Sequence, residues 1–310
     1  MKTILSISTC WNSHRHVDGL AMLDECASLG FDFVELGHGI SYSLWPGILE
    51  GVRKGVVRIS SLHNFCPLPI GFSSAAPNCY EFSDSNFLRR QKALRLTLET
   101  IRHAGELGAA AVVLHLGATG QRRVTPRLTS MLAKGQFGSR GYVRLKIKSV
   151  VEHEKQFHKI WPWIRETLEV CAEEARKCGV KLGLECREAI EEIPMDSLWE
   201  EIFSALPAHV GYWHDFGHAA RKEALGYLDA MALFRRMLPR LAGCHVHDFQ
   251  YPDRDHQPLG EGIIPFKDYI SFFPSGMVCI LELSHRIARK KVEKVQIFCT
   301  KLFNQNSLRF

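Results

Sequence analysis

The chain lacks any run of about 18 or more apolar residues, the length at which a membrane-spanning helix becomes a candidate. It also lacks a strong charge of either sign, because its formal net charge is only +6 over 310 residues. So mild a charge does not by itself indicate a nucleic-acid partner. The opening residues MKTILSIS contain an apolar part that polar residues soon interrupt, so we expect no secretory signal peptide. These absences favour a cytoplasmic globular protein with no membrane partner.

Heptad repeats and low-complexity tracts are also missing, and no second domain is apparent. The ten cysteines are scattered, and several of them (Cys171, Cys186, Cys244 and Cys279) fall inside helix-like or strand-like segments. This distribution favours buried free thiols in a reducing compartment over a disulfide framework. With 46% hydrophobic residues, the 310-residue chain can form one large core. We therefore expect a single domain spanning residues 1–310.

Strand-like and helix-like patterns alternate along the whole chain. The strand-like apolar segments lie at 4–8, 31–36, 56–63, 110–117, 181–185, 209–215, 241–247 and 277–283. Helical spacing is clearest over 17–29, 84–107 and 149–178, and further helices are expected to begin near His218, Pro265 and Arg286. Parallel neighbours need a crossover, usually a helix, so eight such units predict an α/β fold with a parallel sheet. The count favours closure as a (β/α)8 barrel over an open sheet.

Two segments are too long for simple connections. Residues 64–83 follow the third strand and are rich in proline, serine and aromatic residues, and residues 118–148 follow the fourth strand and are strongly basic. Both should lie at the C-terminal face of a barrel, where such enzymes carry their sites and lids. The basic segment has two interpretations: a solvated loop, or a lid in which Arg122 and Arg123 contact a phosphorylated or acidic substrate.

Polar residues of one kind close the later strands. Glu185, Asp215, His247 and Glu282 each end an apolar run, and together they form an oxygen-plus-imidazole set suited to one divalent cation. Because the carboxyl ends of parallel strands meet at one face of a barrel, we expect these four side chains to converge. His63 and His115 belong to the third and fourth strands and extend the same series.

Several blocks, distributed from the third strand to the last, resemble one superfamily. The chain is similar to the xylose isomerase-like barrels, which include sugar isomerases and epimerases, inosose dehydratases, hydroxypyruvate isomerases and endonuclease IV-type enzymes. The matching blocks are LHNFCP (62–67), VVLHLG (112–117), LGLECRE (182–188), DFGHA (215–219), HVHD (245–248), HQPLGEG (256–262) and ILEL (280–283). These blocks are shared by members with different chemistries, so they indicate the fold more specifically than the reaction.

The resemblance implies roles for the strand-end residues. Glu185, Asp215, His247 and Glu282 match the four ligands of the isomerase and epimerase members. Mixed nitrogen and oxygen ligands suit Mn, Zn, Co or Fe. Glu185 and Glu282 would also serve as base and acid. His218 and Arg187 would hold substrate oxygens, with a salt bridge between Arg187 and Glu188 as the alternative.

Other matches point to the three-zinc endonucleases. His63, His115 and His256 match ligand positions there, so one alternative is a second metal between His63, His115 and Glu185, and the other is that these histidines bind substrate. Arg254 stands where those endonucleases carry an acidic ligand, and it lies one residue out of register with a substrate-binding arginine of the epimerases.

Two further histidines belong to the same strands. His245 and His247 are two residues apart and face the same way. His247 is nearer the rim and is the expected ligand, with His245 lower in the barrel. His214 should face the helices and be structural.

The preferred function is a metal-dependent isomerase or epimerase acting on a sugar-like small molecule. The alternatives are an inosose-type dehydratase, a zinc phosphodiesterase on abasic DNA, and a barrel that binds metal and sugar without turnover. Nucleic acid is disfavoured because the loop after His63 is apolar and proline-rich and Arg254 replaces an acidic ligand. A homo-oligomer is compatible with the sequence, which leaves the oligomeric state open.

Overall fold

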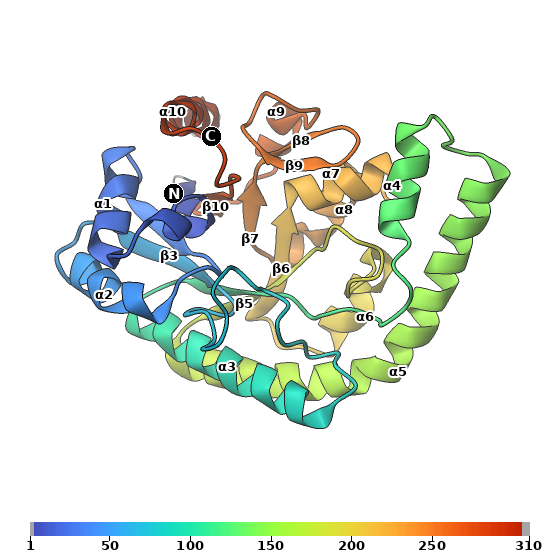
Figure 1. Ribbon diagram of the computed structural model, residues 1–310, viewed down its shortest axis with the longest axis horizontal. Helices are drawn as coiled ribbons and strands as arrows, with labels where there is room; N and C mark the ends of the chain where they lie inside the picture. Colours follow the sequence, from blue (N-terminus) through green and yellow to red (C-terminus); the bar gives the residue numbers. More distant parts are fainter. Residues whose placement is uncertain (1–2, 306–310) are drawn as a thin grey trace.

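The computed structural model describes residues 3–305 and shows a closed parallel barrel surrounded by helices (Figure 1). The barrel strands are β1 (Ile4–Ser8), β2 (Phe33–Leu36), β3 (Arg58–His63), β4 (Ala111–Leu114), β5 (Lys181–Glu185), β6 (Val210–Asp215), β7 (Leu241–Val246) and β10 (Val278–Leu281). Their order around the barrel is β1-β10-β7-β6-β5-β4-β3-β2, and β1 pairs with β2 to close it. The predicted (β/α)8 barrel is confirmed. No helix in the described range is long and apolar enough to cross a membrane.

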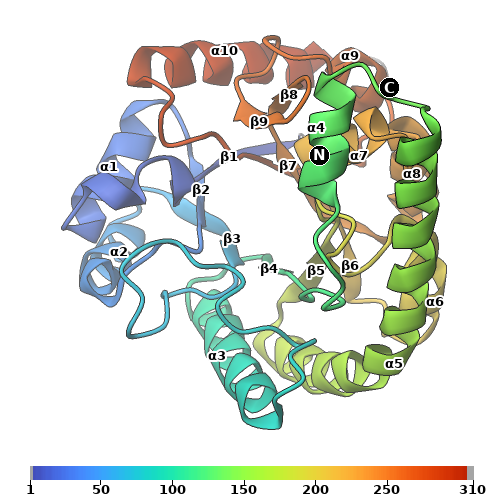
Figure 2. The same ribbon diagram turned by 45° about the vertical axis from the view of Figure 1, so that its right-hand side comes forward.

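Helices form the outer layer of the barrel (Figure 2). They are α1 (Gly19–Ser28), α2 (Trp45–Arg53), α3 (Phe87–Glu106), α4 (Thr125–Ala133), α5 (Arg140–Cys178), α6 (Trp199–Ser204), α7 (Phe216–Ala224), α8 (Ala230–Met237), α9 (Phe266–Ile270) and α10 (Arg289–Gln305). Asp18 caps α1 by accepting the backbone N–H groups of Leu20 and Ala21. The long helix α5 ends at Gly179, whose φ of 70° is the left-handed conformation that glycine adopts most easily.

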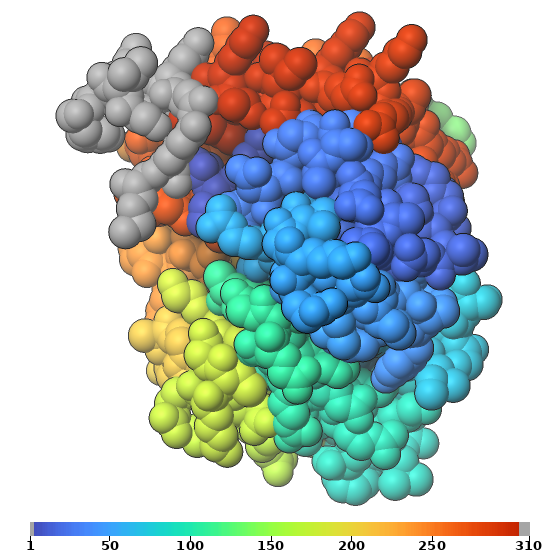
Figure 3. Space-filling model, turned by 90° about the vertical axis from the view of Figure 1, so that its left-hand side faces the viewer, coloured from blue at the N-terminus to red at the C-terminus, as the bar shows by residue number. Residues whose placement is uncertain are grey.

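The first and last parts of the chain lie side by side on the barrel wall. Strand β1 pairs in register with β10, and Gln296 of α10 donates a hydrogen bond to the carbonyl of Gly30. Figure 3 shows the blue N-terminal part of the chain against the red C-terminal part on this face. This pairing brings the residue that follows β10, Glu282, into the same barrel mouth as the ends of the earlier strands.

A tryptophan fills the barrel interior beneath the strand ends. Trp213 of β6 is fully buried and packs with Ala111, Val113 and Ile280. The neighbouring strands carry glycine where the indole passes: a Cβ at Gly183 would lie 2.6 Å from the ring, and one at Gly243 2.4 Å from it. The small residues on β5 and β7 therefore make room for Trp213, which forms the floor below the polar residues.

The basic segment 118–148 is more ordered than the sequence predicts. It contains α4 and the first residues of α5, which begins at Arg140 rather than near 149. Ser139 starts α5 early by accepting the N–H of Tyr142, whose hydroxyl donates to the carbonyl of Leu225. The segment that follows β4 therefore contains helical structure, and its interpretation as a lid stays a prediction.

A short hairpin follows β7 and was not expected. It consists of β8 (Asp248–Gln250) and β9 (Arg254–Gln257), which pair antiparallel. Both oxygens of the Asp248 carboxylate accept backbone N–H groups, including those of Gly260, Gly262 and Ile264. This buried aspartate fixes the segment that carries Asp255 and His256 over the barrel mouth.

Candidate metal centre and substrate pocket

Three carboxylates and one imidazole converge at the C-terminal mouth of the barrel. The ligand atoms of Glu185, Asp215, His245 and Glu282 all lie within 4.8 Å of one another, and all four side chains are buried. Nδ1 of His245 lies 2.7 Å from Oε1 of Glu185, 3.2 Å from Oε2 of Glu282 and 3.6 Å from Oδ2 of Asp215. Three of the four residues expected as ligands are thus brought together, but the histidine among them is His245.

The strand register explains the difference between the two histidines. His245 of β7 is paired with Asp215 of β6, so both side chains leave the barrel wall at one level. Strand β7 ends at Val246, and His247 lies beyond it, with Nε2 3.0 Å and 3.1 Å from the two oxygens of Asp215. Nδ1 of His247 accepts the backbone N–H of His256 at 2.8 Å. Both nitrogens of His247 are therefore engaged, and the ring orients Asp215 from outside the cluster.

The charges within this cluster favour a cation. Burial raises the pKa of Glu185, but Arg187 and His115 outweigh burial and hold the pKa well below its ordinary value. Burial also raises the pKa of Glu282, but His245 and His256 bring it well below. For His245, burial lowers the pKa, and the carboxylates of Glu282 and then Glu35 hold it well above the ordinary value. Burial also raises the pKa of Asp215, but His218 and His247 hold it well below its ordinary value. Three ionised carboxylates thus surround a protonated His245, an excess of negative charge that attracts a cation. Once the ring gives up its proton, the four residues form a donor set that fits a divalent metal with mixed N and O ligands.

A fourth carboxylate supports His245 from behind, and the sequence did not reveal it. Glu35 of β2 is 0% exposed, and its Oε2 atom lies 3.3 Å from Nε2 of His245. Ser61 Oγ donates to the same oxygen at 2.8 Å. The signal for it was a glutamate between apolar residues in the strand Phe33–Leu36, FVEL. A buried carboxylate on the outer nitrogen of a ligand histidine fixes both its ring orientation and its tautomer.

A second cluster adjoins the first through Glu185. Ligand atoms of His63, His115 and Glu185 lie within 4.8 Å of one another. Nε2 of His115 is 2.6 Å from Oε2 of Glu185, and Nε2 of His63 is 3.9 Å from it. Burial and then Arg187 lower the pKa of His115, and burial and then His115 lower the pKa of His63, so both rings are neutral at pH 7.

Arg187 lies inside this second cluster rather than in the substrate pocket. Its Nη1 atom is 2.5 Å from Oε2 of Glu185, and its Nε atom is 3.0 Å from Oε1 of Glu192. Glu188, the alternative partner considered from the sequence, instead pairs with Arg221. Whether Arg187 also contacts substrate, as expected from the sequence, is not tested by these contacts.

A third cluster forms where the hairpin meets α7. Ligand atoms of His218, Asp255 and His256 lie within 4.8 Å of one another, so Asp255 supplies a carboxylate although residue 254 is an arginine. Arg254 is itself exposed on β9. His256 has a φ of 51°, and its ring stacks on that of His247 at 4.2 Å between centroids. Its Nε2 atom lies 3.6 Å from Oε2 of Glu282, which links the third cluster to the first.

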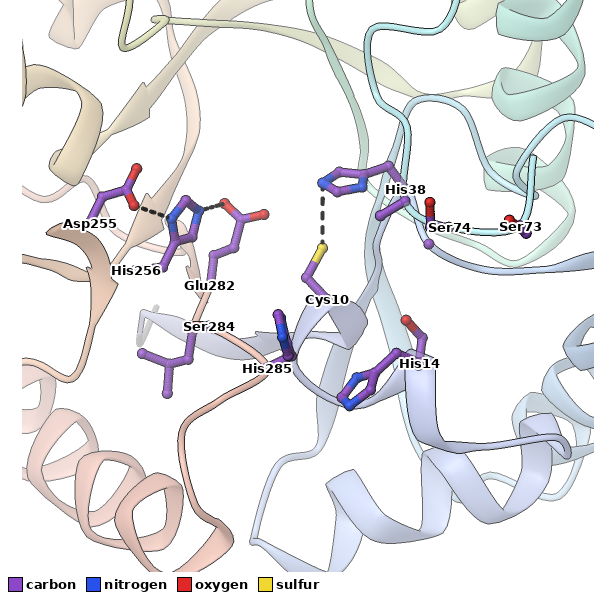
Figure 4. A pocket seen from close by; sticks show the side chains of 14 residues that line it. Cys10, His14, His38, Ser73, Ser74, Asp255, His256, Glu282, Ser284 and His285 are labelled. Atoms are coloured by element: carbon purple, nitrogen blue, oxygen red, sulfur yellow. Dashed lines mark hydrogen bonds and ion pairs between the residues drawn. The ribbon is translucent and has the colours of Figure 1, made fainter. Parts of the chain in front are cut away.

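A cavity of about 570 Å³ opens beside Glu282 (Figure 4). It is lined by Cys10, Ser13, His14, His38, Gly39, Ser73, Ser74, Ala75, Asp255, His256, Glu282, Leu283, Ser284 and His285. No lysine or arginine occurs among the described residues that line it. Hydroxyl, imidazole and carboxylate groups are suited to hydrogen bonding with a hydroxylated small molecule.

Two lining residues on the β1 and β2 side of the cavity contact each other. Cys10 Sγ lies 3.7 Å from Nε2 of His38, as the dashed line in Figure 4 shows. Burial and then Glu282 raise the pKa of the Cys10 thiol well above its ordinary value. Burial lowers the pKa of His38 to about 4. Both groups are therefore neutral at pH 7.

Four further residues singled out from the sequence, His218, Arg122, Arg123 and His214, do not line this cavity. The Nδ1 atom of His218 donates to the carbonyl oxygen of Cys186 at 3.0 Å. Arg122 and Arg123 are exposed and are not among the residues that line the cavity. As expected, His214 faces the helix layer, where its ring packs against Phe216 and Phe234.

Solved structures share this architecture at low sequence identity. A D-tagatose 3-epimerase-like protein matches with a TM-score of 0.69 and 18% identity, covering 99% of this chain and 98% of its own. An L-ribulose 3-epimerase matches with a TM-score of 0.69 and 14% identity, covering 98% and 96%. An IOLI protein with a bound zinc atom matches with a TM-score of 0.65 and 13% identity, covering 99% of each chain. At these identities the likeness is one of fold.

No curated protein matches the chain. A family model described as the xylose isomerase-like TIM barrel matches residues 23–296, from within α1 to within α10. The chain therefore belongs to the xylose isomerase-like TIM barrel family.

Proposed function

We propose that the protein is a metal-dependent isomerase or epimerase acting on a neutral, sugar-like substrate. The observation that carries the proposal is the cluster of Glu185, Asp215, His245 and Glu282, which borders a hydroxyl-binding cavity through Glu282. The sugar epimerases among the structural neighbours support it at the level of fold. The zinc atom bound by another neighbour, the IOLI protein, supports it in the same way.

Glu185, Asp215, His245 and Glu282 would hold one divalent ion, for which Mn, Zn, Co and Fe all suit the donor set. Such an ion supplies Lewis acidity, which makes the carbon-bound proton next to a bound carbonyl easier to remove. Glu35 would keep Nδ1 of His245 directed at the cluster by holding Nε2 on the opposite side of the ring. His247 would keep the carboxylate of Asp215 in place beside the cluster through its Nε2 atom.

Glu185 and Glu282 are the residues we assign to proton transfer. In the barrel order, β5 and β10 are separated by β6 and β7, so the two carboxylates approach the site from different directions. Both stay ionised, as a general base must before it accepts a proton. Removing a proton on one side and returning it on the other inverts a carbon centre, and returning it to the neighbouring carbon moves the carbonyl.

The cavity favours a substrate without phosphate. Its described lining includes the hydroxyls of Ser13, Ser73 and Ser284 but neither lysine nor arginine. The carboxylates of Asp255 and Glu282 border the same space. A phosphate dianion buried there would lack lysine or arginine partners to offset its desolvation.

Phosphodiester hydrolysis is the second candidate. The adjoining clusters around His63 and His115 and around His218 and Asp255 favour it, because multinuclear sites suit in-line displacement at phosphorus. The absence of lysine and arginine among the described residues that line the cavity weighs against it. The dehydratase would use the same metal and carboxylates, and only product analysis separates it from an epimerase.

The test combines metal analysis with hydrogen exchange. The purified chain, loaded separately with Mn, Co, Zn or Fe, is incubated in heavy water with neutral ketoses and inososes, and deuterium incorporation is measured by NMR. We expect incorporation next to a carbonyl with the wild type and none with Glu185→Gln or Glu282→Gln. Glu261→Gln is the matched control, because Glu261 pairs with Lys291 on the surface. Cleavage of abasic DNA without exchange in any sugar would contradict the proposal.

A further inference from the structure

The cluster of His63, His115 and Glu185 has the composition of a metal site, yet another cation already lies in it. Nη1 of Arg187 is 2.8 Å from Nε2 of His115 and 2.5 Å from Oε2 of Glu185. A metal ion held by this cluster would bind those same two atoms. The guanidinium nitrogen therefore lies where a second ion would have to bind.

We infer that Arg187 is a built-in cation that takes the position of a second metal ion and keeps the centre mononuclear. The inference rests on the proposed function, because it presupposes one metal at Glu185, Asp215, His245 and Glu282. It makes Arg187 a residue that determines metal number, rather than a substrate contact.

Arg187 is anchored on the side away from the cluster. Its Nε atom donates to Oε1 of Glu192 at 3.0 Å, and Oε2 of Glu192 accepts the backbone N–H of Ala189 at 3.0 Å. The whole residue is 7% exposed. A guanidinium keeps its charge at any ordinary pH, so it cannot give way to a metal by losing a proton.

The two oxygens of Glu185 are divided between the two clusters. Oε1 faces His245 at 2.7 Å, and Oε2 faces Arg187 at 2.5 Å and His115 at 2.6 Å. Arg187 thus satisfies the oxygen that would otherwise bridge to a second ion. It leaves Oε1 directed at the first cluster.

The experiment counts and locates metal in the full chain. Metal-free protein is titrated with zinc, bound zinc is measured after gel filtration, and anomalous diffraction shows which residues hold it. In the wild type we expect zinc at the four-residue cluster and none on His63 and His115. Arg187→Ala should gain one further equivalent per chain, held by His63, His115 and Glu185.

Two controls separate charge from disruption. Arg187→Lys keeps a cation and should show no zinc on His63 and His115. The double variant Arg187→Ala with His63→Ala should lose the extra equivalent, which distinguishes this position from the cluster at His218. Circular dichroism and the thermal midpoint check that Arg187→Ala is folded, because Arg187 also holds Glu192.

Two results would overturn the inference. One is zinc bound to His63 and His115 in the wild type, with Arg187 displaced; this result alone contradicts the inference. The other is an Arg187→Ala variant that folds but binds no zinc on His63 and His115. By contrast, a wild type with no metal at Glu185, Asp215, His245 and Glu282 counts against the proposed function itself.

Discussion

Nε2 of His245 lies 3.3 Å from Oε2 of Glu35, so two residues from strands that are not neighbours meet inside the barrel. The other nitrogen of the same ring faces Glu185, Asp215 and Glu282. With Nε2–H donated to Glu35, Nδ1 is the nitrogen at which a metal would replace the ring proton, and the negative charge of Glu35 increases the basicity of the imidazole.

Glu35→Gln should weaken metal binding without removing any ligand. The amide keeps the size of the side chain but lacks its charge, and loss of such supporting carboxylates lowers metal affinity by about 10–100-fold. Competition with a chromogenic chelator measures the zinc affinity. Glu50→Gln is the control, because Glu50 is an exposed residue paired with Lys54. An affinity for Glu35→Gln within about twofold of the wild type would show that Glu35 does not support the site.

The two histidines of β7 and its extension should respond differently to the same substitution. His245→Asn removes the nitrogen that faces all three carboxylates, so we expect the metal to be lost at micromolar zinc. His247→Asn keeps a donor for Asp215 and leaves the four-residue cluster intact, so metal should remain with a smaller loss of affinity. Metal analysis of both variants decides between them. Loss of metal in His247→Asn with retention in His245→Asn would restore His247 as the ligand.

Features that depend on strand periodicity or on the last residue of a single strand could be predicted from the sequence. The barrel, and the convergence of Glu185, Asp215 and Glu282, follow because each of these residues ends or directly follows its strand. Of His245 and His247, which face the same way, the sequence favoured His247 as the ligand because it is nearer the rim. The register that pairs Asp215 with His245 is a property of two strands together.

Residues that act through distant partners were harder to predict. From the sequence, Arg187 was expected to contact substrate or to pair with Glu188, and only the fold brings it against His115 and Glu192. Asp255 reaches the third cluster because the hairpin after β7 turns it inward, and hairpin geometry there was not recognised from the sequence. Helix α4 was missed because glycine-rich and basic residues around it resemble a loop.

His153 should make stability fall as the pH falls. Its Nδ1–H donates to the carbonyl of Ile190 at 2.7 Å, while Nε2 is buried without a partner among the described residues. Burial lowers the pKa of His153 to about 4 from 6.5. The unfolded chain therefore binds the proton first, and stability present above pH 6.5 is lost progressively towards pH 4. The loss is on the order of 3 kcal/mol at the lower limit.

Denaturant unfolding at several pH values between 7.5 and 4.5 measures this effect. His153→Gln can still donate to Ile190 but cannot take up a proton, so its stability should fall less steeply than that of the wild type. His158→Gln, on the exposed side of the same helix α5, should follow the wild type. Parallel curves for His153→Gln and the wild type would contradict the assignment.

A neutral substrate should be preferred over its phosphate ester. The described lining of the cavity offers serine hydroxyls and imidazoles, and Asp255 and Glu282 add negative charge without lysine or arginine to balance a phosphate. We expect kcat/KM for exchange in a neutral ketose to exceed that for the corresponding ketose phosphate by about 10-fold or more, since a factor of ten corresponds to only about 1.4 kcal/mol.

His285→Arg tests whether charge at the rim decides this preference. His285 is exposed, and its ring lies 5.1 Å from that of His14, so an arginine there can reach a phosphate without altering the metal cluster. The variant should narrow the gap between the two substrates by raising the rate with the phosphate ester, with little change for the neutral sugar. His285→Gln, which adds no charge, should leave the gap as it is. A wild type that prefers the phosphate ester would refute the neutral-substrate proposal and return attention to Arg122 and Arg123 as anion contacts.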